Sequence, residues 1–301
     1  MLGQATRPHV ETLAGRLPSA GELRELAAEH GLDFATLLLF QAVHASPVHA
    51  AFIAAVEGEK ISTSHAPLDV KILIIPALFY GLYPETGADG RFAADIARQC
   101  GFSVGTIPIK SMGTSTENAR IIRDALAHET ASQIWIFGIS KGNADFRAYL
   151  QLYPAEAAAA PLRGWINVCG VVGGSQVADH HTRTRFGALK YRAICRLFGA
   201  GYDLLREMRT DHPYWRKPIV LPPQMKVFSF VAIPLGAHIQ KTLIKRYRAV
   251  SPFGPNDGMV VCRDAILDGG PAYPVWGADH FFRSPEVIPL LYRFFSFLRG
   301  Q

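Results

Sequence analysis

The sequence Gln-Ile-Trp-Ile-Phe-Gly-Ile-Ser-Lys-Gly-Asn-Ala-Asp at residues 133–145 decides the fold of this chain. Its apolar start is followed by the pattern G-x-S-x-G, Gly138 to Gly142, and then by a segment with helical character up to Leu150. This order predicts a buried strand, a sharp turn and a helix, with Ser140 at the apex of the turn. Glycines beside the serine let the strand and the helix approach each other. The pattern alone also occurs in ordinary turns, so the flanking strand and helix carry the inference.

Outward from this stretch, apolar segments alternate with amphipathic ones from Val70 to the C-terminus. Strands are predicted at 70–75, 103–108, 133–137, 164–171, 226–233 and 272–276. Helices are predicted at 88–100, 115–129, 141–152, 237–249 and 284–299. Apolar strands separated by helices predict an α/β fold, in which a mostly parallel central sheet is covered by helices on both faces.

Residues 1–66 precede this alternation and are predicted to form a helical N-terminal extension to a domain at 67–301. Ser19 and Glu22 have the spacing of a capping box at the start of one helix. Asp33 is placed to cap a second helix, and Pro47 is placed to begin a third. The sequence leaves open whether this extension packs beside the sheet or covers the pocket.

Residues 183–225 have no strand pattern, and we interpret them as a cap or lid inserted between two strands of the domain. Between Arg183 and Lys226 there are ten Lys and Arg residues against three Asp and Glu residues. This surplus of seven exceeds the net charge of +6 of the whole chain. A basic lid that faces a lipid or polymer surface and a solvated helical excursion with extended arginines explain the composition equally well.

The composition sets bounds on the class of protein. Hydrophobic residues make up 49% of the 301 residues and charged residues 19%, which indicates a soluble globular protein with a large core. The mild positive charge comes without a nucleic-acid-binding module, so we expect no nucleic-acid partner. The N-terminus lacks a secretory signal and no apolar run reaches 18 residues, so we expect a cytoplasmic protein without a transmembrane segment. Four widely spaced cysteines predict buried thiols rather than disulfides: Cys100, Cys169, Cys195 and Cys262.

A serine hydroxyl becomes a nucleophile only beside a base, and that base needs an acid to fix its tautomer. His280 is the best of the eleven histidines, because it follows the strand at 272–276 in a loop, where a parallel sheet places reactive groups. Asp257 is the best acid, because it lies in a loop rich in Pro, Gly and Asn between the serine and the histidine. Three further carboxylates are less well placed: Asp264, Asp268 and Asp279.

The order Ser140, Asp257, His280 is that of the α/β-hydrolase fold, and from about Val70 onward the chain resembles that superfamily. Within it, the chain looks most like bacterial serine lipases and esterases. Asn-Asp-Gly-Met-Val at 256–260 resembles the D-G-x-V around the lipase acid. Gly-Ser-Gln-Val-Ala-Asp at 174–179 is similar to the G-S-x-x-A-D segment of lipases.

One departure from that family concerns the oxyanion hole, the pair of backbone N–H groups that stabilises the reacting carbonyl. Where lipases usually have His-Gly, this chain has Pro76-Ala77. Backbone donors do not depend on the side chain, so the hole is still expected. We predict the N–H of Lys141 as one donor and that of Leu78 or Phe79 as the other, since proline has no N–H.

These residues predict a serine hydrolase that cleaves a carboxylic ester of a small-molecule or acyl substrate and requires neither a metal nor an organic cofactor. A thioesterase, an acyltransferase and an intracellular polyester depolymerase use the same triad. A binding module with a hydrolase-like fold is a rival of another class, and such modules usually lose a triad member. A phosphate-binding turn at Gly138 to Gly142 is disfavoured because the spacing fits neither common phosphate-binding pattern.

Overall fold

The structure, a computed structural model, describes residues 2–61 and 65–301. Residues 1 and 62–64, which belong to the predicted extension 1–66, lie outside the described residues. The chain divides into two compact units. We call Thr63–Val227 the serine unit, and Met1–Ser62 together with Phe228–Gln301 the histidine unit.

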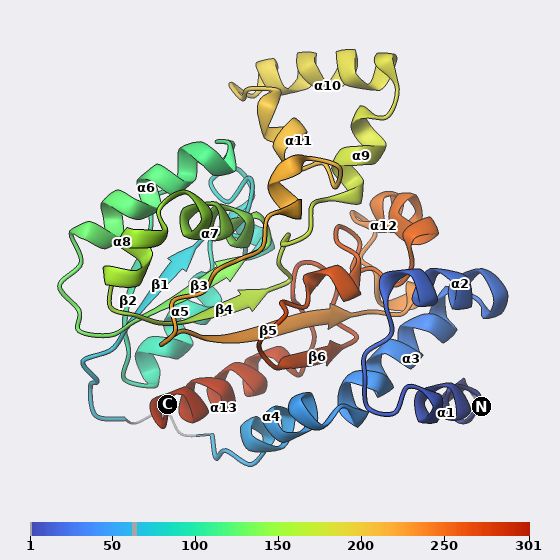
Figure 1. The fold of residues 1–301 in the computed structure, drawn as a ribbon, viewed down its shortest axis with the longest axis horizontal. Helices are drawn as coiled ribbons and strands as arrows, with labels where there is room; N and C mark the ends of the chain where they lie inside the picture. The colour runs from blue at the N-terminus through green and yellow to red at the C-terminus, as the bar shows by residue number, and fades with distance from the viewer. Residues whose placement is uncertain (1, 62–64) are drawn as a thin grey trace. The chain divides into compact units, whose positions relative to one another are not determined.

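The serine unit contains four parallel strands in the order β2-β1-β3-β4. The strands are β1 (Lys71–Ile75), β2 (Ser103–Thr106), β3 (Ile134–Ile139) and β4 (Leu162–Val168). The helices that follow them are α5 (Arg91–Gln99), α6 (Ser115–Ala127), α7 (Lys141–Leu152) and α8 (Pro154–Ala159), with the short 3-10 helix η1 (Pro84–Thr86). α7 packs against β1 and β3, and α5 packs against β1 and β2 (Figure 1). Every residue of β3 is buried, as its unbroken apolar sequence predicts.

The insertion predicted at 183–225 overlaps a helical segment at 176–216 of the same unit, which we call the insertion from here on. It consists of α9 (Gln176–Thr182), α10 (Arg185–Leu197), α11 (Asp203–Glu207) and the 3-10 helix η2 (Pro213–Arg216). No strand occurs at 176–225, all of which the structure describes, but the helices end at Arg216 and residues 217–225 are not helical. Whether the insertion acts as a lid is a separate matter and stays a prediction.

The base of the insertion is fixed to α6 and α7. The Glu207 carboxylate accepts hydrogen bonds from the Ser115 N–H at 2.7 Å and from the Thr116 hydroxyl at 2.9 Å. On α7, Arg147 donates to the carbonyls of Trp215 and Lys217 at 2.9 and 2.8 Å. These contacts join the C-terminal part of the insertion to α6 and α7.

The histidine unit contains the parallel strands β5 (Lys226–Ile233), whose first two residues belong to the serine unit, and β6 (Ala272–Trp276). Its α-helices are α1 (Leu2–Thr12), α2 (Ala20–His30), α3 (Leu32–Ala45), α4 (Pro47–Glu57), α12 (Ile244–Val250) and α13 (Val287–Arg299). Its 3-10 helices are η3 (Gly236–His238), η4 (Ser251–Phe253) and η5 (Cys262–Ala265). The parallel strands and intervening helices of the two units confirm the predicted α/β class.

In the N-terminal extension, α3 and α4 pack beside β6, α4 also packs against α13, and α1 and α2 pack on α3. Phe52 on α4 lies among aromatic rings of β5, β6 and α13, with its ring stacked on Phe228 at 4.9 Å. The capping box of Ser19 and Glu22 is present, and Pro47 begins α4.

Among the described residues no single helix has the length and apolar composition of a membrane span. α3 and α4 meet those criteria only as a pair, which bends by 80°.

Two local predictions are wrong. Asp33 does not cap α3, because the helix begins one residue earlier with Gly31 as its cap; the Asp33 carboxylate instead accepts a hydrogen bond from the Gly236 N–H at 3.1 Å. The helix predicted at 237–249 is broken into η3 and the short α12. At the break, the Gln240 N–H donates to the Asp279 carboxylate at 3.0 Å and not to a helix carbonyl. The four cysteines are buried thiols, as predicted.

Candidate active site in two parts

Ser140 lies on a strained turn between β3 and α7, as its sequence pattern predicts. Its backbone angles are φ 49° and ψ −117°, a combination that non-glycine residues rarely adopt. Hydrogen bonds on both sides hold this conformation: the Ser140 N–H donates to the Val168 carbonyl at 3.0 Å, and its carbonyl accepts from the N–H groups of Val171 and Asn143 at 3.1 Å each. The neighbouring strand β4 therefore fixes the apex of the turn.

The two glycines of the pattern are required by close approach rather than by unusual angles. A side chain at Gly138 would overlap the amide of Asn143, which accepts a hydrogen bond from the Trp165 indole at 2.8 Å. A side chain at Gly142 would overlap the Ile75 carbonyl and lie 2.7 Å from that of Pro76. Because Gly142 has no side chain, the first turn of α7 rests directly on the end of β1.

This contact places the predicted oxyanion donors in one region of the serine unit. Ile75 pairs with Gly138 in register, so the loops after β1 and β3 leave neighbouring strands at the same level. The Ala77 N–H donates to the Ala88 carbonyl at 2.8 Å and is excluded as a donor. Within the described part of the chain, no hydrogen bond occupies the N–H of Leu78, Phe79 or Lys141. Phe79 has a positive φ of 62°, which turns the loop sharply at this point.

A buried ion pair, which the sequence analysis did not identify, lies on α7, the helix that begins directly after Ser140. The Lys141 ammonium lies 2.5 Å from Asp145 Oδ1, and both side chains are fully buried. Asp145 Oδ2 accepts from the Asn118 amide at 2.8 Å, which ties α7 to α6. Burial raises the pKa of Asp145, although Lys141 and Asn118 act in the opposite direction. The signal in the sequence is the spacing of four residues on one helix, which places the two charges on one face.

We expect Lys141→Met to lower the free energy of unfolding by about 3–5 kcal/mol at neutral pH, because it leaves the Asp145 carboxylate buried without its cation. A buried carboxyl whose pKa is raised favours the protonated native state, so stability falls as pH rises from the ordinary carboxyl range toward the raised pKa. The variant should therefore lose more stability with rising pH than the wild type does. Denaturant unfolding between about pH 5 and pH 8 measures this.

Lys110→Met is the matched control, because Lys110 forms an exposed ion pair with Glu117 at 3.1 Å. That substitution should change stability by less than about 1 kcal/mol. Equal pH dependence in Lys141→Met and the wild type would show that Asp145 does not depend on Lys141.

The predicted acid and base meet in the histidine unit. His280 Nδ1 lies 2.8 Å from Asp257 Oδ2, and both side chains are buried. Asp257 Oδ1 accepts from the N–H groups of Met259 and Val260 at 2.9 and 2.8 Å. A further bond joins the His280 N–H to the Asp257 carbonyl at 2.9 Å. Because a carboxylate oxygen accepts, the neutral imidazole carries its proton on Nδ1 and leaves Nε2 as the acceptor.

The three other carboxylates considered from the sequence lie in different surroundings. Asp279 is buried and points away, since its two oxygens accept from the N–H groups of Gln240 and Phe281. Burial raises the pKa of Asp279. Asp268 is exposed in the loop before β6, and Asp264 belongs to η5. The structure thus gathers the predicted residues into two groups, one in each unit: Ser140, Lys141, Leu78 and Phe79; and Asp257 and His280.

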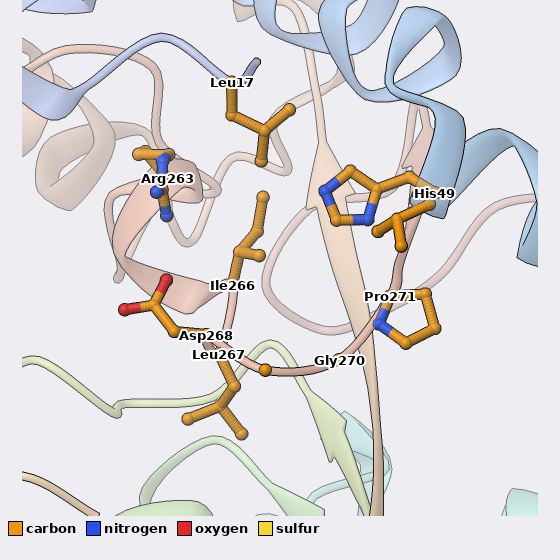
Figure 2. A pocket seen from close by; sticks show the side chains of 10 residues that line it. Leu17, His49, Arg263, Ile266, Leu267, Asp268, Gly270 and Pro271 are labelled. Carbon is orange, nitrogen blue, oxygen red and sulfur yellow. The ribbon is translucent and has the colours of Figure 1, made fainter. Parts of the chain in front are cut away.

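A pocket of about 400 Å³ lies elsewhere in the histidine unit (Figure 2). It is bordered by Leu17, by His49 on α4 and by the loop from Ile266 to Pro271. The ring of His49 is oriented by a hydrogen bond from the Ala272 N–H to Nδ1 at 3.0 Å. No predicted site residue lines this pocket, so it is separate from both groups.

Comparison with known proteins identifies a shared architecture. No family model matches the sequence, and no curated protein matches it. Among solved structures, the chain is similar to the metagenomic carboxyl esterase MGS0156, with 20% identity over 81% of this chain and 78% of that one, at a TM-score of 0.61. It is also similar to the mature lipase BlEst2 of Bacillus licheniformis, with 19% identity over 77% of this chain and 94% of that one, at a TM-score of 0.54. At these identities the likeness is one of fold.

Proposed function

We propose that this chain, which has the α/β-hydrolase fold, is a serine hydrolase that cleaves a carboxylic ester through Ser140, His280 and Asp257. The observation that carries the proposal is the buried hydrogen bond between His280 Nδ1 and Asp257 Oδ2. A serine nucleophile needs an imidazole held in this tautomer. Ser140, at the strained apex after β3, supplies the hydroxyl.

In the proposed reaction, Ser140 Oγ attacks the ester carbonyl while His280 Nε2 takes the hydroxyl proton. The carbonyl oxygen becomes an oxyanion, which the N–H of Lys141 and that of Leu78 or Phe79 stabilise; loss of one such donor costs roughly 3–4 kcal/mol. His280 returns its proton to the leaving alcohol as the C–O bond breaks and an acyl-enzyme remains. Water then attacks the acyl group with His280 again as the base, which releases the acid and restores the serine.

The loop after β1 supports an apolar acyl group or an aromatic alcohol as the substrate. Leu82 and Tyr83 on this loop are 50% and 47% exposed, and Phe79 contacts the ring of Tyr83. Apolar side chains near the oxyanion donors favour a substrate with little charge. A thioesterase, an acyltransferase and a polyester depolymerase need the same triad and differ in the leaving group or the acceptor.

A binding module without catalysis is the rival of another class. It has no need for a buried imidazole paired with a carboxylate, and the Asp257–His280 pair therefore favours the enzyme.

Hydrolysis of p-nitrophenyl esters across a series of acyl chain lengths tests the proposal. We expect release of p-nitrophenol by the purified chain, with a preference for some chain lengths. Added small alcohols distinguish hydrolysis from transfer, since a transferase forms the new ester in preference to the free acid. If no ester or thioester in the series is turned over, the proposed reaction is wrong.

A further inference from the structure

Helix α10 exposes a row of apolar side chains that no part of its own unit covers. Phe186, Leu189 and Leu197 are 79%, 66% and 82% exposed, and Ala193 between them is exposed as well. Their spacing of three, four and four residues places them along one face of the helix. Single exposed apolar residues are ordinary, but a row of this length along one helix indicates a surface that binds something. We call these four residues the α10 stripe.

Positive charges flank this stripe. At 100° per residue, Arg185, Arg192 and Arg196 lie along one border of the α10 stripe and Lys190 lies along the other. All four are exposed, and none forms an ion pair with any described carboxylate. No Asp or Glu occurs at 180–202. Part of the basic surplus of the insertion is therefore concentrated beside exposed apolar groups.

The opposite face of α10 holds the helix onto the insertion. Cys195 on that face is buried, and Tyr191 stacks on the His181 ring of α9 at 4.1 Å. Figure 1 shows α10, in yellow, joined to its unit through α9 and α11 and lying away from β1–β4. The α10 stripe is therefore the outward face of a helix whose inward face is already packed.

We propose that α10 docks this protein onto an anionic lipid bilayer, lying in the plane of the interface. An anionic bilayer can bind both the apolar stripe and the positive charges beside it. Phe and Leu side chains enter the boundary of the acyl chains, while Arg and Lys side chains contact the lipid phosphates. Pairing with a second copy of the chain would bring two sets of positive charges together without carboxylates between them, which is unfavourable. Charge complementarity thus selects the anionic lipid.

Docking through α10 does not involve the base of the insertion, which stays bound to α6 and α7. Glu207 and Arg147 hold that base to α6 and α7, and the Tyr214 hydroxyl adds a bond to the Ala144 carbonyl at 2.8 Å. Substitutions in the stripe or its flanks should therefore leave turnover of a soluble substrate unchanged. Lipid binding is measured without turnover, so its failure is separate from a failure of the proposed hydrolase activity.

The test is co-sedimentation of the full chain with vesicles of phosphatidylglycerol and phosphatidylcholine, compared with vesicles of phosphatidylcholine alone. We expect binding to the anionic vesicles that weakens with added salt, and little binding to the neutral ones. A charge variant, Arg185→Gln with Arg192→Gln and Arg196→Gln, should bind on the order of 10²-fold more weakly. A stripe variant, Phe186→Ser with Leu189→Ser and Leu197→Ser, should also lose binding.

The matched control removes three exposed arginines elsewhere, Arg24→Gln with Arg120→Gln and Arg163→Gln, and lowers the net charge equally. It should bind as the wild type does. Equal binding to neutral vesicles, retention of binding in both α10 variants, or a dimer in the absence of lipid that the stripe variant dissociates would each overturn the proposal.

Discussion

Replacing Ser140 by alanine is expected to abolish ester hydrolysis, with a fall in kcat on the order of 10⁶, while the thermal transition stays nearly unchanged. The catalytic part follows from the loss of the only group that forms the acyl-enzyme in the proposed reaction. The stability part follows from the backbone. Alanine and serine carry the same Cβ at φ 49°, and the hydrogen bonds to Val168, Val171 and Asn143 involve only main-chain atoms of residue 140.

The matched control is Ser103→Ala, which removes an exposed hydroxyl at the start of β2. Its kcat and Tm should both equal those of the wild type. Ester turnover retained in Ser140→Ala, measured with enzyme free of wild-type contamination, would contradict the assignment of the nucleophile.

Asp257→Asn should lower kcat by on the order of 10⁴. The N–H groups of Met259 and Val260 both donate to Asp257 Oδ1, so the carbonyl oxygen of the new asparagine is held there. Its NH₂ group then takes the place of Oδ2 and donates to His280 Nδ1. This places the imidazole proton on Nε2, where it can no longer accept the serine proton. The steady-state kcat measures this loss, and an unchanged circular dichroism spectrum shows that the fold is intact.

Asp268→Asn is the matched control, because it makes the same chemical change at an exposed carboxylate eleven positions along the chain. It should leave kcat unaltered. A full loss of activity in Asp279→Asn, with activity retained in Asp257→Asn, would identify Asp279 as the acid instead.

The strands could be predicted closely because each is a short apolar run with turn residues at its ends. β5 and β6 agree with the predicted 226–233 and 272–276. β2 ends at Thr106 rather than at residue 108, where a proline has no N–H to donate to a neighbour. The helix α1 lies within the predicted helical extension, but no local pattern locates it, and Pro8 inside it is unfavourable for a helix. Contacts with α3, such as the hydrogen bond from Thr6 to Gln41 at 2.6 Å, support α1 and depend on tertiary structure.

Some features of the candidate site could also be predicted from the sequence, and others could not. The pairing of Asp257 with His280 could be anticipated because both follow strands and loops of the expected kind. The spacing of Lys141 and Asp145 indicates that they share a helix face, but their burial could not be anticipated, since it depends on the packing of α7 against α6. The hydrogen bond from the Ala77 N–H to the Ala88 carbonyl also depends on how the loop after β1 folds back on itself. No local pattern in the sequence specifies that path.

The rate at which a fluorophosphonate probe modifies Ser140 tests most directly whether His280 activates this hydroxyl. Peptide mass spectrometry locates the adduct, and its time course gives the second-order rate constant in the wild type and in His280→Ala. The account predicts rapid modification confined to the peptide that contains Ser140, and a loss of at least about 10³-fold in the variant. Equal rates in the two proteins, or an adduct on another residue, would contradict it.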